Sequence, residues 1–242
     1  MKQIAIIVLL LISNTMALWG DLGRTLLAQQ YYNNENYKEA QNIYEQLLLL
    51  NPNSPELNYN LGNTFYNQNK LGKAKYYYQH SLKLSPRDSD IHHNLKIINN
   101  QVIDNINSSM SFRSLLNRLV SLIKISEILI IIAGLFTILN ISTFIWLKLN
   151  KDLAKATSII VSILIGLSSI GVTYKTSLKS QVGIIIKEKV AIKSGPLNSF
   201  DTLFYLHDGT EFTVVNHNEK WTKLKLENGL VGWIDNIDYW KH

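Results

Sequence analysis

The stretch "LNYNLGNTFYNQNKLGKAKYYYQHSLKLSP", residues Leu57–Pro86, decides the fold of the first part of the chain. Apolar residues recur at helical spacing both before and after the polar turn Asn69–Gly72. Pro86 ends the second pattern, because proline lacks the amide donor and clashes with the preceding helical turn. The sequence therefore predicts two helices joined by a tight turn.

This helix pair belongs to an internal repeat with a period of 34 residues. Shifting the chain by that period aligns small, aromatic and proline positions: Ala28 with Gly62, Ala40 with Ala74, Tyr44 with Tyr78, and Pro52 with Pro86. A third, partial copy follows, in which "YNLG" at Tyr59–Gly62 returns as "HNLK" at His93–Lys96. The pattern resembles the tetratricopeptide repeat. This resemblance implies an all-α solenoid over residues 18–107, with two full repeats, a polar capping helix and a concave surface for a protein partner.

The first residues have the features of an export signal. Lys2 precedes the apolar run Ile4–Ile12, and Thr15–Ala17 offers small residues for cleavage, with Gly20 as a second option. Nine apolar residues are too few to span a bilayer, which needs about 20. We predict a signal peptide over residues 1–17, and the alternative is a buried first helix of the repeat array.

Two longer apolar stretches predict a transmembrane hairpin over residues 126–176. Ile128–Leu147 and Ala156–Tyr174 carry no charge and are long enough to cross a membrane. The lysine-rich link Lys148–Lys155 joins them. Small residues Ser158, Ser162 and Gly166 recur every four positions, which would allow close approach of the first helix. A stripe without a partner is the alternative.

The segment 108–125, ahead of the hairpin, is predicted to be an amphipathic juxtamembrane helix. Its apolar residues recur at helical spacing and its basic residues lie off that stripe. It could equally be the last helix of the solenoid. The net charge of +6 is concentrated in residues 108–181, which carry eight basic and two acidic side chains. This distribution indicates contact with membrane lipid and argues against a nucleic-acid partner.

The number of spans sets the topology. Two spans place the repeats and the C-terminal region on the same side of the membrane, and an export signal places both outside the cytoplasm. The lysine link then faces the cytoplasm, in agreement with the positive-inside rule. We predict a protein of the bacterial inner membrane with both soluble domains in the periplasm.

The C-terminal region, residues 182–242, changes to short β runs separated by turns. The predicted strands are Val182–Ile186, Lys189–Lys193, Phe212–Val215, Trp221–Leu226 and Leu230–Ile234. Asn228-Gly229 predicts a two-residue hairpin in which both positions adopt positive φ. Five or six short strands in this length predict a small all-β barrel.

The C-terminal residues resemble the bacterial SH3 domain family. The resemblance rests on "VAIKSGP" (Val190–Pro196), "LHDGTEFTVV" (Leu206–Val215), "WTKLKLENG" (Trp221–Gly229) and "VGWI" (Val231–Ile234). It implies an SH3-like barrel that recognises peptides or cell-wall stems, with Tyr205 and Trp233 as groove residues. Trp221 and Trp233 could instead fill a core that is too small to be stable without large aromatic side chains.

The sequence contains no motif for catalysis or cofactor binding. It has no cysteine, no nucleophile elbow, no phosphate loop and no dinucleotide fingerprint. No two of its six histidines lie four positions apart, the spacing that would place both on one helix face as metal ligands. We therefore expect no enzyme activity, no catalytic residue, no cofactor and no metal site.

Mapping the repeat period onto the first helix of each repeat predicts the partner groove. The predicted groove residues are Gln29, Tyr32, Asn33, Tyr59, Asn60, Asn63 and Asn67. Thr25 and Tyr66 fall on the same positions, and Asp90, His93 and Asn94 extend them into the cap. Repeats that grip a terminal carboxylate use lysine and arginine at several of these positions, and this chain does not. A neutral groove suits a polar peptide backbone or a flat protein face, and a compositional bias toward asparagine is the alternative.

The order of the modules over the whole chain resembles the BatE-type aerotolerance proteins. That resemblance implies a non-catalytic envelope scaffold that assembles membrane proteins of the von Willebrand A-domain type and serves stress resistance. The alternative is a cell-wall attachment module in which the SH3-like barrel binds peptidoglycan peptides. An accessory subunit of an enzyme complex is a third hypothesis, supported by the repeat array alone.

Overall fold

The computed structural model describes residues 21–104, 120, 122–149, 152–177 and 182–241. The chain divides into two compact units: Met1–Asn107 with Gln181–His242 form one, and Ser108–Ser180 form the other. The predicted signal peptide lies outside the described residues. So does most of the predicted amphipathic segment 108–125.

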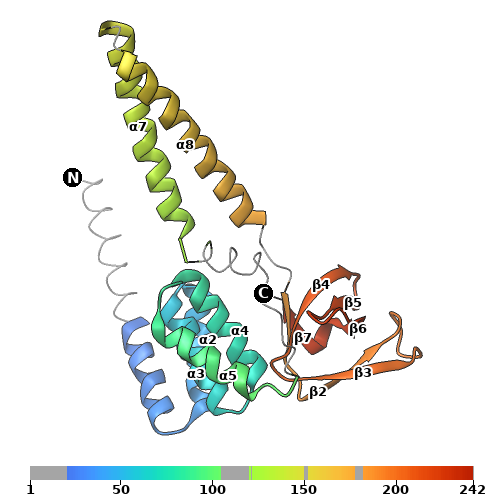
Figure 1. Cartoon of the computed structure of the whole chain (residues 1–242). Coiled ribbons are helices and arrows are strands. Elements are labelled where there is room, and N and C mark those ends of the chain that lie inside the picture. Colours follow the sequence, from blue (N-terminus) through green and yellow to red (C-terminus); the bar gives the residue numbers. More distant parts are fainter. Residues whose placement is uncertain (1–20, 105–119, 121, 150–151, 178–181, 242) are drawn as a thin grey trace, which may run out of the picture. The chain divides into compact units, whose positions relative to one another are not determined.

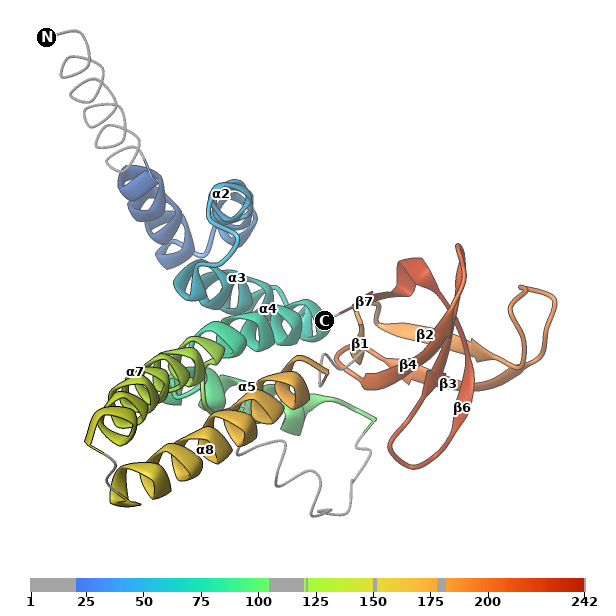
Figure 2. The same cartoon turned by 90° about the horizontal axis from the view of Figure 1, so that it is seen from above.

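The described residues in the N-terminal half of the first unit form helices joined by turns, with no strand among them (Figure 1). Its helices cover residues 21–33, α2 Tyr37–Leu50, α3 Pro55–Asn67, α4 Leu71–Leu84 and α5 Ser89–Gln101. They form two helix pairs and one further helix, as the repeat predicts. Figure 2 shows α3 and α4 side by side, and these two helices are in contact.

Local sequence signals set the ends of these helices. The Ser54 hydroxyl accepts a hydrogen bond from the Leu57 amide at 3.2 Å, and Pro55 occupies the first turn of α3. Asp88 caps α5 in the same way. The turns within the two pairs contain Glu35 and Asn69 with φ of 60° and 58°, at matching positions of the repeat. A left-handed residue just after a helix lets the chain reverse direction.

The core of the array is built from the positions that recur in the repeat. Ala28, Ala40, Ala74, Tyr44 and Tyr78 are all buried. At Gly62, a Cβ would lie 2.5 Å from the Tyr78 ring, so glycine is required for this close approach. The small residues of the repeat therefore allow the aromatic side chain of the next helix to pack directly against the backbone.

The C-terminal half of the first unit is an antiparallel sheet of seven strands, called the β domain below. The strands are β1 Val182–Ile185, β2 Lys189–Lys193, β3 Thr202–His207, β4 Glu211–His217, β5 Trp221–Lys225, β6 Val231–Asp235 and β7 Tyr239–Lys241. They are arranged in the order β3-β2-β6-β5-β4-β1-β7. A core of aliphatic and aromatic residues, including Ile192, Leu224 and Ile234, fills one side of the sheet.

The strand predictions were correct for five strands and missed β3 and β7. The two-residue hairpin predicted at Asn228-Gly229 is wrong, because only Gly229 has a positive φ, at 89°. The Leu226 amide donates to the Leu230 carbonyl at 2.8 Å, so the loop between β5 and β6 consists of residues 227–229. In a hairpin loop of this length only the last residue is left-handed, and here that residue is Gly229.

The second unit is a pair of helices, α7 Ile125–Leu149 and α8 Asp152–Ser177. Each is long and apolar enough to cross a membrane, and almost none of its side chains is buried within the chain. Figure 1 shows the two helices as an antiparallel hairpin. This agrees with the predicted spans Ile128–Leu147 and Ala156–Tyr174.

The contact between α7 and α8 corrects the predicted small-residue stripe. Ala154 and Val161 are buried, and the Ser158 hydroxyl lies 3.0 Å from that of Ser142. Ser162 is exposed, and a Cβ on Gly166 would meet nothing. The helices meet near the link through hydroxyl groups and diverge farther along, so only Ser158 of the predicted stripe contributes.

Candidate functional site

Three helices carry a shared set of tyrosine and amide side chains, which we call the tyrosine–amide surface. These helices are the one over residues 21–33, α3 and α5. The first two are the first helices of their repeats, and α5 is the capping helix. The members are Tyr32, Tyr59, Tyr66, Asn63, Asn67, Asn94 and Gln101, with Tyr78 of α4 at its base. No member carries a formal charge at neutral pH.

Hydrogen bonds on this surface follow the repeat. The Asn67 amide donates to the Tyr32 hydroxyl at 2.7 Å, and the Gln101 amide donates to the Tyr66 hydroxyl at 2.9 Å. Each donor lies 35 residues after its acceptor, and the second pair lies one repeat after the first. The same bond therefore joins each first helix to the next one.

A second cluster lies around Asn63. The Tyr78 hydroxyl donates to the Asn63 carbonyl oxygen at 2.6 Å, and the Asn94 amide lies 3.2 Å from that oxygen and 3.2 Å from the Tyr59 hydroxyl. Burial raises the pKa of the Tyr78 phenol above its usual value, which keeps it a neutral donor. These bonds fix the rotamers of the side chains at the centre of the surface.

The predicted groove residues divide into two groups. Tyr32, Tyr59, Asn63 and Asn67 belong to the hydrogen-bonded clusters just described. Gln29 and Asn33 are exposed on the helix over residues 21–33, and Asn60 is half-buried on α3. The second group extends the surface with amide groups that are accessible to solvent.

A hollow of about 760 Å³ lies at the start of the array. Its lining includes Leu22, Thr25, Leu50 and Leu57. Thr25 precedes Gln29 by four residues on the same helix, so the hollow and the tyrosine–amide surface share one helix face. The surface thus combines amide and phenol groups with a neighbouring apolar depression.

The predicted aromatic residues of the β domain lie on its outer face, next to lysines. Tyr205 is 51% exposed, and the Lys189 ammonium group lies 4.3 Å from its ring centroid. Half-buried Trp233 pairs with Lys193 on one neighbouring strand and with Lys223 on the other. Trp221 is buried, as expected of a core residue.

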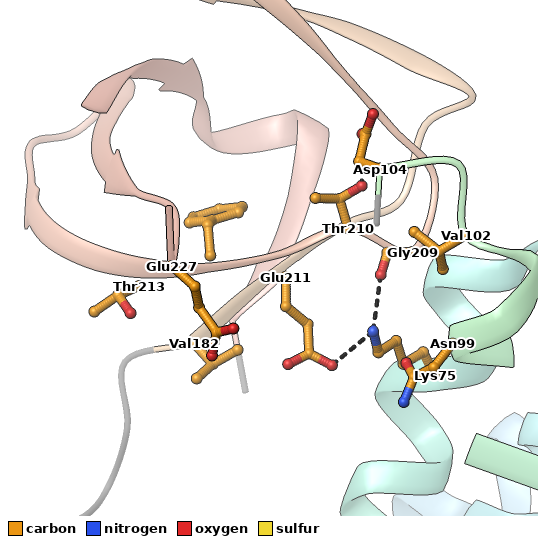
Figure 3. Close-up of a pocket in the computed structure, with 11 residues that line it drawn as sticks. Lys75, Asn99, Val102, Asp104, Val182, Gly209, Thr210, Glu211, Thr213 and Glu227 are labelled. Carbon is orange, nitrogen blue, oxygen red and sulfur yellow. Dashed lines mark hydrogen bonds and ion pairs between the residues drawn. The ribbon is translucent and has the colours of Figure 1, made fainter. Parts of the chain in front are cut away.

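A third set of contacts joins the repeats to the β domain within the first unit (Figure 3). The buried ammonium group of Lys75 on α4 lies 2.7 Å from the Glu211 carboxylate and donates to the Gly209 carbonyl at 3.1 Å. Gln79, one turn later, donates to Glu211 at 2.7 Å. A cavity of about 270 Å³ lies beside these groups.

Two aspartates also join the repeats to the β domain, and we call this whole set of contacts the seam. Asp104 accepts hydrogen bonds from the His207 amide at 2.6 Å and the Thr210 hydroxyl at 2.8 Å. Partial burial opposes its ionisation, but these hydrogen bonds outweigh burial and hold the pKa of Asp104 below its usual value. Asp208 accepts from the Gly72 amide at 3.0 Å, and burial raises its pKa despite that bond.

Aromatic packing extends the seam away from the charged groups. The Trp240 ring of β7 lies edge-on to the rings of Tyr76 and Tyr77, with centroid distances of 5.0 and 5.8 Å. The Lys73 ammonium group lies 5.1 Å from the Trp240 centroid. The seam therefore combines apolar area with specific polar contacts.

Sequence reasoning did not identify this seam. Its residues carry no motif, and they come from segments separated by more than 100 positions. One signal was present: Lys75 stands where the first repeat has Gln41, on a helix whose other buried positions are mostly small or apolar. Within the described residues, no group of three or more His, Asp or Glu side chains could hold a metal ion.

Comparison with known proteins gave one family match and a similar solved structure. A solved structure, the first tetratricopeptide repeat domain of Spaghetti (RPAP3) bound to the HSP90 peptide SRMEEVD, is 17% identical with a TM-score of 0.20. That match covers 34% of this chain and 91% of the other. No curated protein matches the chain. Residues 31–96 match the model of the tetratricopeptide repeat family. By that family match, the chain described above contains tetratricopeptide repeats.

Proposed function

We propose that this protein is a membrane-anchored scaffold of the bacterial envelope that binds a protein partner through the tyrosine–amide surface. The observation that carries this proposal is the ordered, uncharged row of phenol and amide groups along the repeat helices. Preordered side chains lose little conformational entropy when a partner binds. The scaffold role is the usual role of tetratricopeptide repeats, and no catalytic role is proposed.

The chemistry of the surface favours an extended, uncharged peptide segment. An amide side chain can donate and accept at once, as a peptide backbone does. Exposed Gln29 and Asn33, and half-buried Asn60, provide such groups. The surface has no lysine or arginine to bind a terminal carboxylate, so an internal segment of the partner suits it better than a chain end.

The two long apolar helices and the export signal predicted from the sequence support the proposed location. We propose that α7 and α8 cross the inner membrane and that the repeats and the β domain lie in the periplasm. The whole-chain resemblance to BatE-type proteins supports partners that are membrane proteins of the von Willebrand A-domain type and a role in aerotolerance.

Site-specific photo-crosslinking in cells tests the partner surface. A photoreactive amino acid at Gln29 or Asn60 is expected to trap a membrane-protein partner, whereas the same amino acid at Asn42 is not. Asn42 is exposed on α2, the second helix of its repeat, and provides the matched control. Equal adducts at all three positions, or none at Gln29 and Asn60, would overturn the assignment.

The second candidate function is cell-wall attachment through the outer face of the β domain. The lysines beside Tyr205 and Trp233 favour it, because peptidoglycan stems carry carboxylates that a lysine can pair with. Binding of the full chain to purified sacculi tests it. Retention that is lost in Trp233→Ala would support attachment, and no retention of the wild-type chain would exclude it.

A further inference from the structure

We propose that the β domain completes the repeat array by docking permanently on α4. This docking holds together the two parts of the chain that flank the hairpin of α7 and α8. The docking surface of α4 consists of Gly72, Lys75, Tyr76 and Gln79. This inference is separate from the proposed partner surface, which lies on the first helices of the repeats.

The start of α4 is built to receive the β domain. Helices α3 and α5 are capped by their own residues Ser54 and Asp88, whereas the N-cap residues of α2 and α4, Asn36 and Lys70, supply no side-chain cap. Among these four helices, only at α4 does the β domain supply the acceptor. Asp208, in the turn between β3 and β4, accepts from the Gly72 amide instead. The free amides of a helix start need a partner, and here the partner comes from the other domain.

Gly72 makes this approach possible. A Cβ at this position would lie 1.9 Å from the Ile185 carbonyl oxygen and 2.5 Å from the Asp208 carboxylate, so no side chain fits. The matching position of the first repeat is Lys38, which is exposed. The second repeat therefore departs from the first at the point where the β domain contacts it.

Within the described residues, the array is shorter than the repeat arrays that are stable by themselves. Repeat arrays bury a continuous core by stacking neighbours, and about three repeats are needed for stability. Two repeats and α5 are present in the described residues. The β domain provides the missing neighbour, because Trp240 packs on Tyr76 and Tyr77 and the Lys75 ammonium group is buried against Gly209 and Glu211.

Docking has a consequence for the membrane hairpin. The chain enters Ser108–Ser180 from the repeats and leaves it into the β domain, and these two flanking parts form one compact unit. The contact therefore closes the chain into a non-covalent loop that contains the hairpin. Both ends of the hairpin must then lie on the same side of any membrane that it crosses.

Hydrogen exchange of the full chain in lipid nanodiscs tests the docking. We compare Gly72→Ala with Gly23→Ala, where a Cβ would meet nothing. Alanine favours a helix at both positions, so loss of helix propensity cannot explain a difference. In Gly72→Ala, the amides of His207 and Gly209 are expected to exchange at least about tenfold faster than in the wild type. Equal exchange in Gly72→Ala and the wild type would overturn the proposal.

A second measurement needs no variant. A carbodiimide joins a lysine and a carboxylate that are in contact, so it is expected to link Lys75 to Glu211. Mixing ¹⁵N-labelled and unlabelled chains shows whether each link lies within one molecule. Links with uniform labelling support docking within the chain, and absent or mixed-label links contradict it. Neither result depends on the photo-crosslinking partner, so the two proposals can fail separately.

Discussion

The Asp208 carboxylate accepts a hydrogen bond from the Gly72 amide at 3.0 Å, across 136 positions of sequence. A helix in the repeat array is thus capped by a residue of the β domain. Because burial raises the pKa of Asp208, the contact depends on the acceptor oxygen more than on the charge.

Replacing Asp208 separates these two contributions. Asp208→Ala removes the cap and is expected to lower the free energy of unfolding by about 0.5–2 kcal/mol. Asp208→Asn keeps an oxygen that can accept from the Gly72 amide and should retain most of that stability. Thermal unfolding followed by circular dichroism measures both, and equal losses in the two variants would contradict the prediction.

The pH dependence of the same variants follows from the sign of the shift. A raised folded-state pKa contributes stability that is present below the unfolded pKa, about 3.9, and is lost as pH rises through the folded pKa. Asparagine does not titrate. Relative to the wild type, Asp208→Asn should therefore gain stability as pH rises above about 3.9, the unfolded-state pKa. An advantage that shrinks with rising pH would disprove this.

The repeat core gives a second prediction, at Gly62. Alanine is the better helix former by about 1 kcal/mol, but a Cβ here would lie 2.5 Å from the Tyr78 ring. Overpacking costs about 1–3 kcal/mol, so we expect Gly62→Ala to be destabilising. Gly23→Ala is the matched control and should be neutral or stabilising. Chemical denaturation of both variants distinguishes the two effects.

The buried tyrosines predict alkaline sensitivity. Burial raises the pKa of Tyr44 and of Tyr77 to about 12 and also raises the pKa of Tyr78. Their contribution to stability is complete below pH 10 (about the unfolded pKa) and is lost as pH rises through the folded values. Helical signal should fall above about pH 10, and Tyr44→Phe should shift that midpoint upward. Tyr205→Phe, on the exposed face of β3, is the control, and an equal shift in it would refute the explanation.

The absence of cysteine makes membrane topology directly measurable. Single cysteines at Asn42, Lys225 and Lys148 replace exposed side chains on α2, β5 and the end of α7. A membrane-impermeant maleimide should label the first two from the periplasmic side of intact cells and the third only after permeabilisation. Labelling of Asn42→Cys and Lys225→Cys from opposite sides would exclude both the docking and the two-span topology.

The sequence predicted those parts of the fold that depend on local patterns. Proline and small residues at a fixed period determine the helix pairs, and the length of the apolar runs determines α7 and α8. β3 was missed because its exposed Leu203 and Tyr205 break the usual alternation. β7 was missed because a three-residue strand carries too little signal.

The tyrosine–amide surface was predicted in part for a similar reason. The repeat period maps Tyr32, Tyr59 and Asn63 onto the first helices of the repeats, and each of them takes part in a hydrogen-bonded cluster. That they contact a partner stays a prediction. The role of Tyr78 could not be read from the sequence, since its position is also the core position of the repeat. The seam could not be predicted either, because pairs such as Asp104 and His207 meet only through tertiary folding.

The distance in sequence between Gly72 and Asp208 has a consequence for biogenesis. The ribosome adds about 5–20 residues each second, so α4 emerges on the order of ten seconds before the turn that will cap it. With the proposed topology, the hairpin enters the membrane during that interval while the receptor surface of α4 remains uncovered. Maturation of the repeats is therefore coupled to completion of the polypeptide, and a truncated product would display Tyr76 and Tyr77 to quality-control proteases.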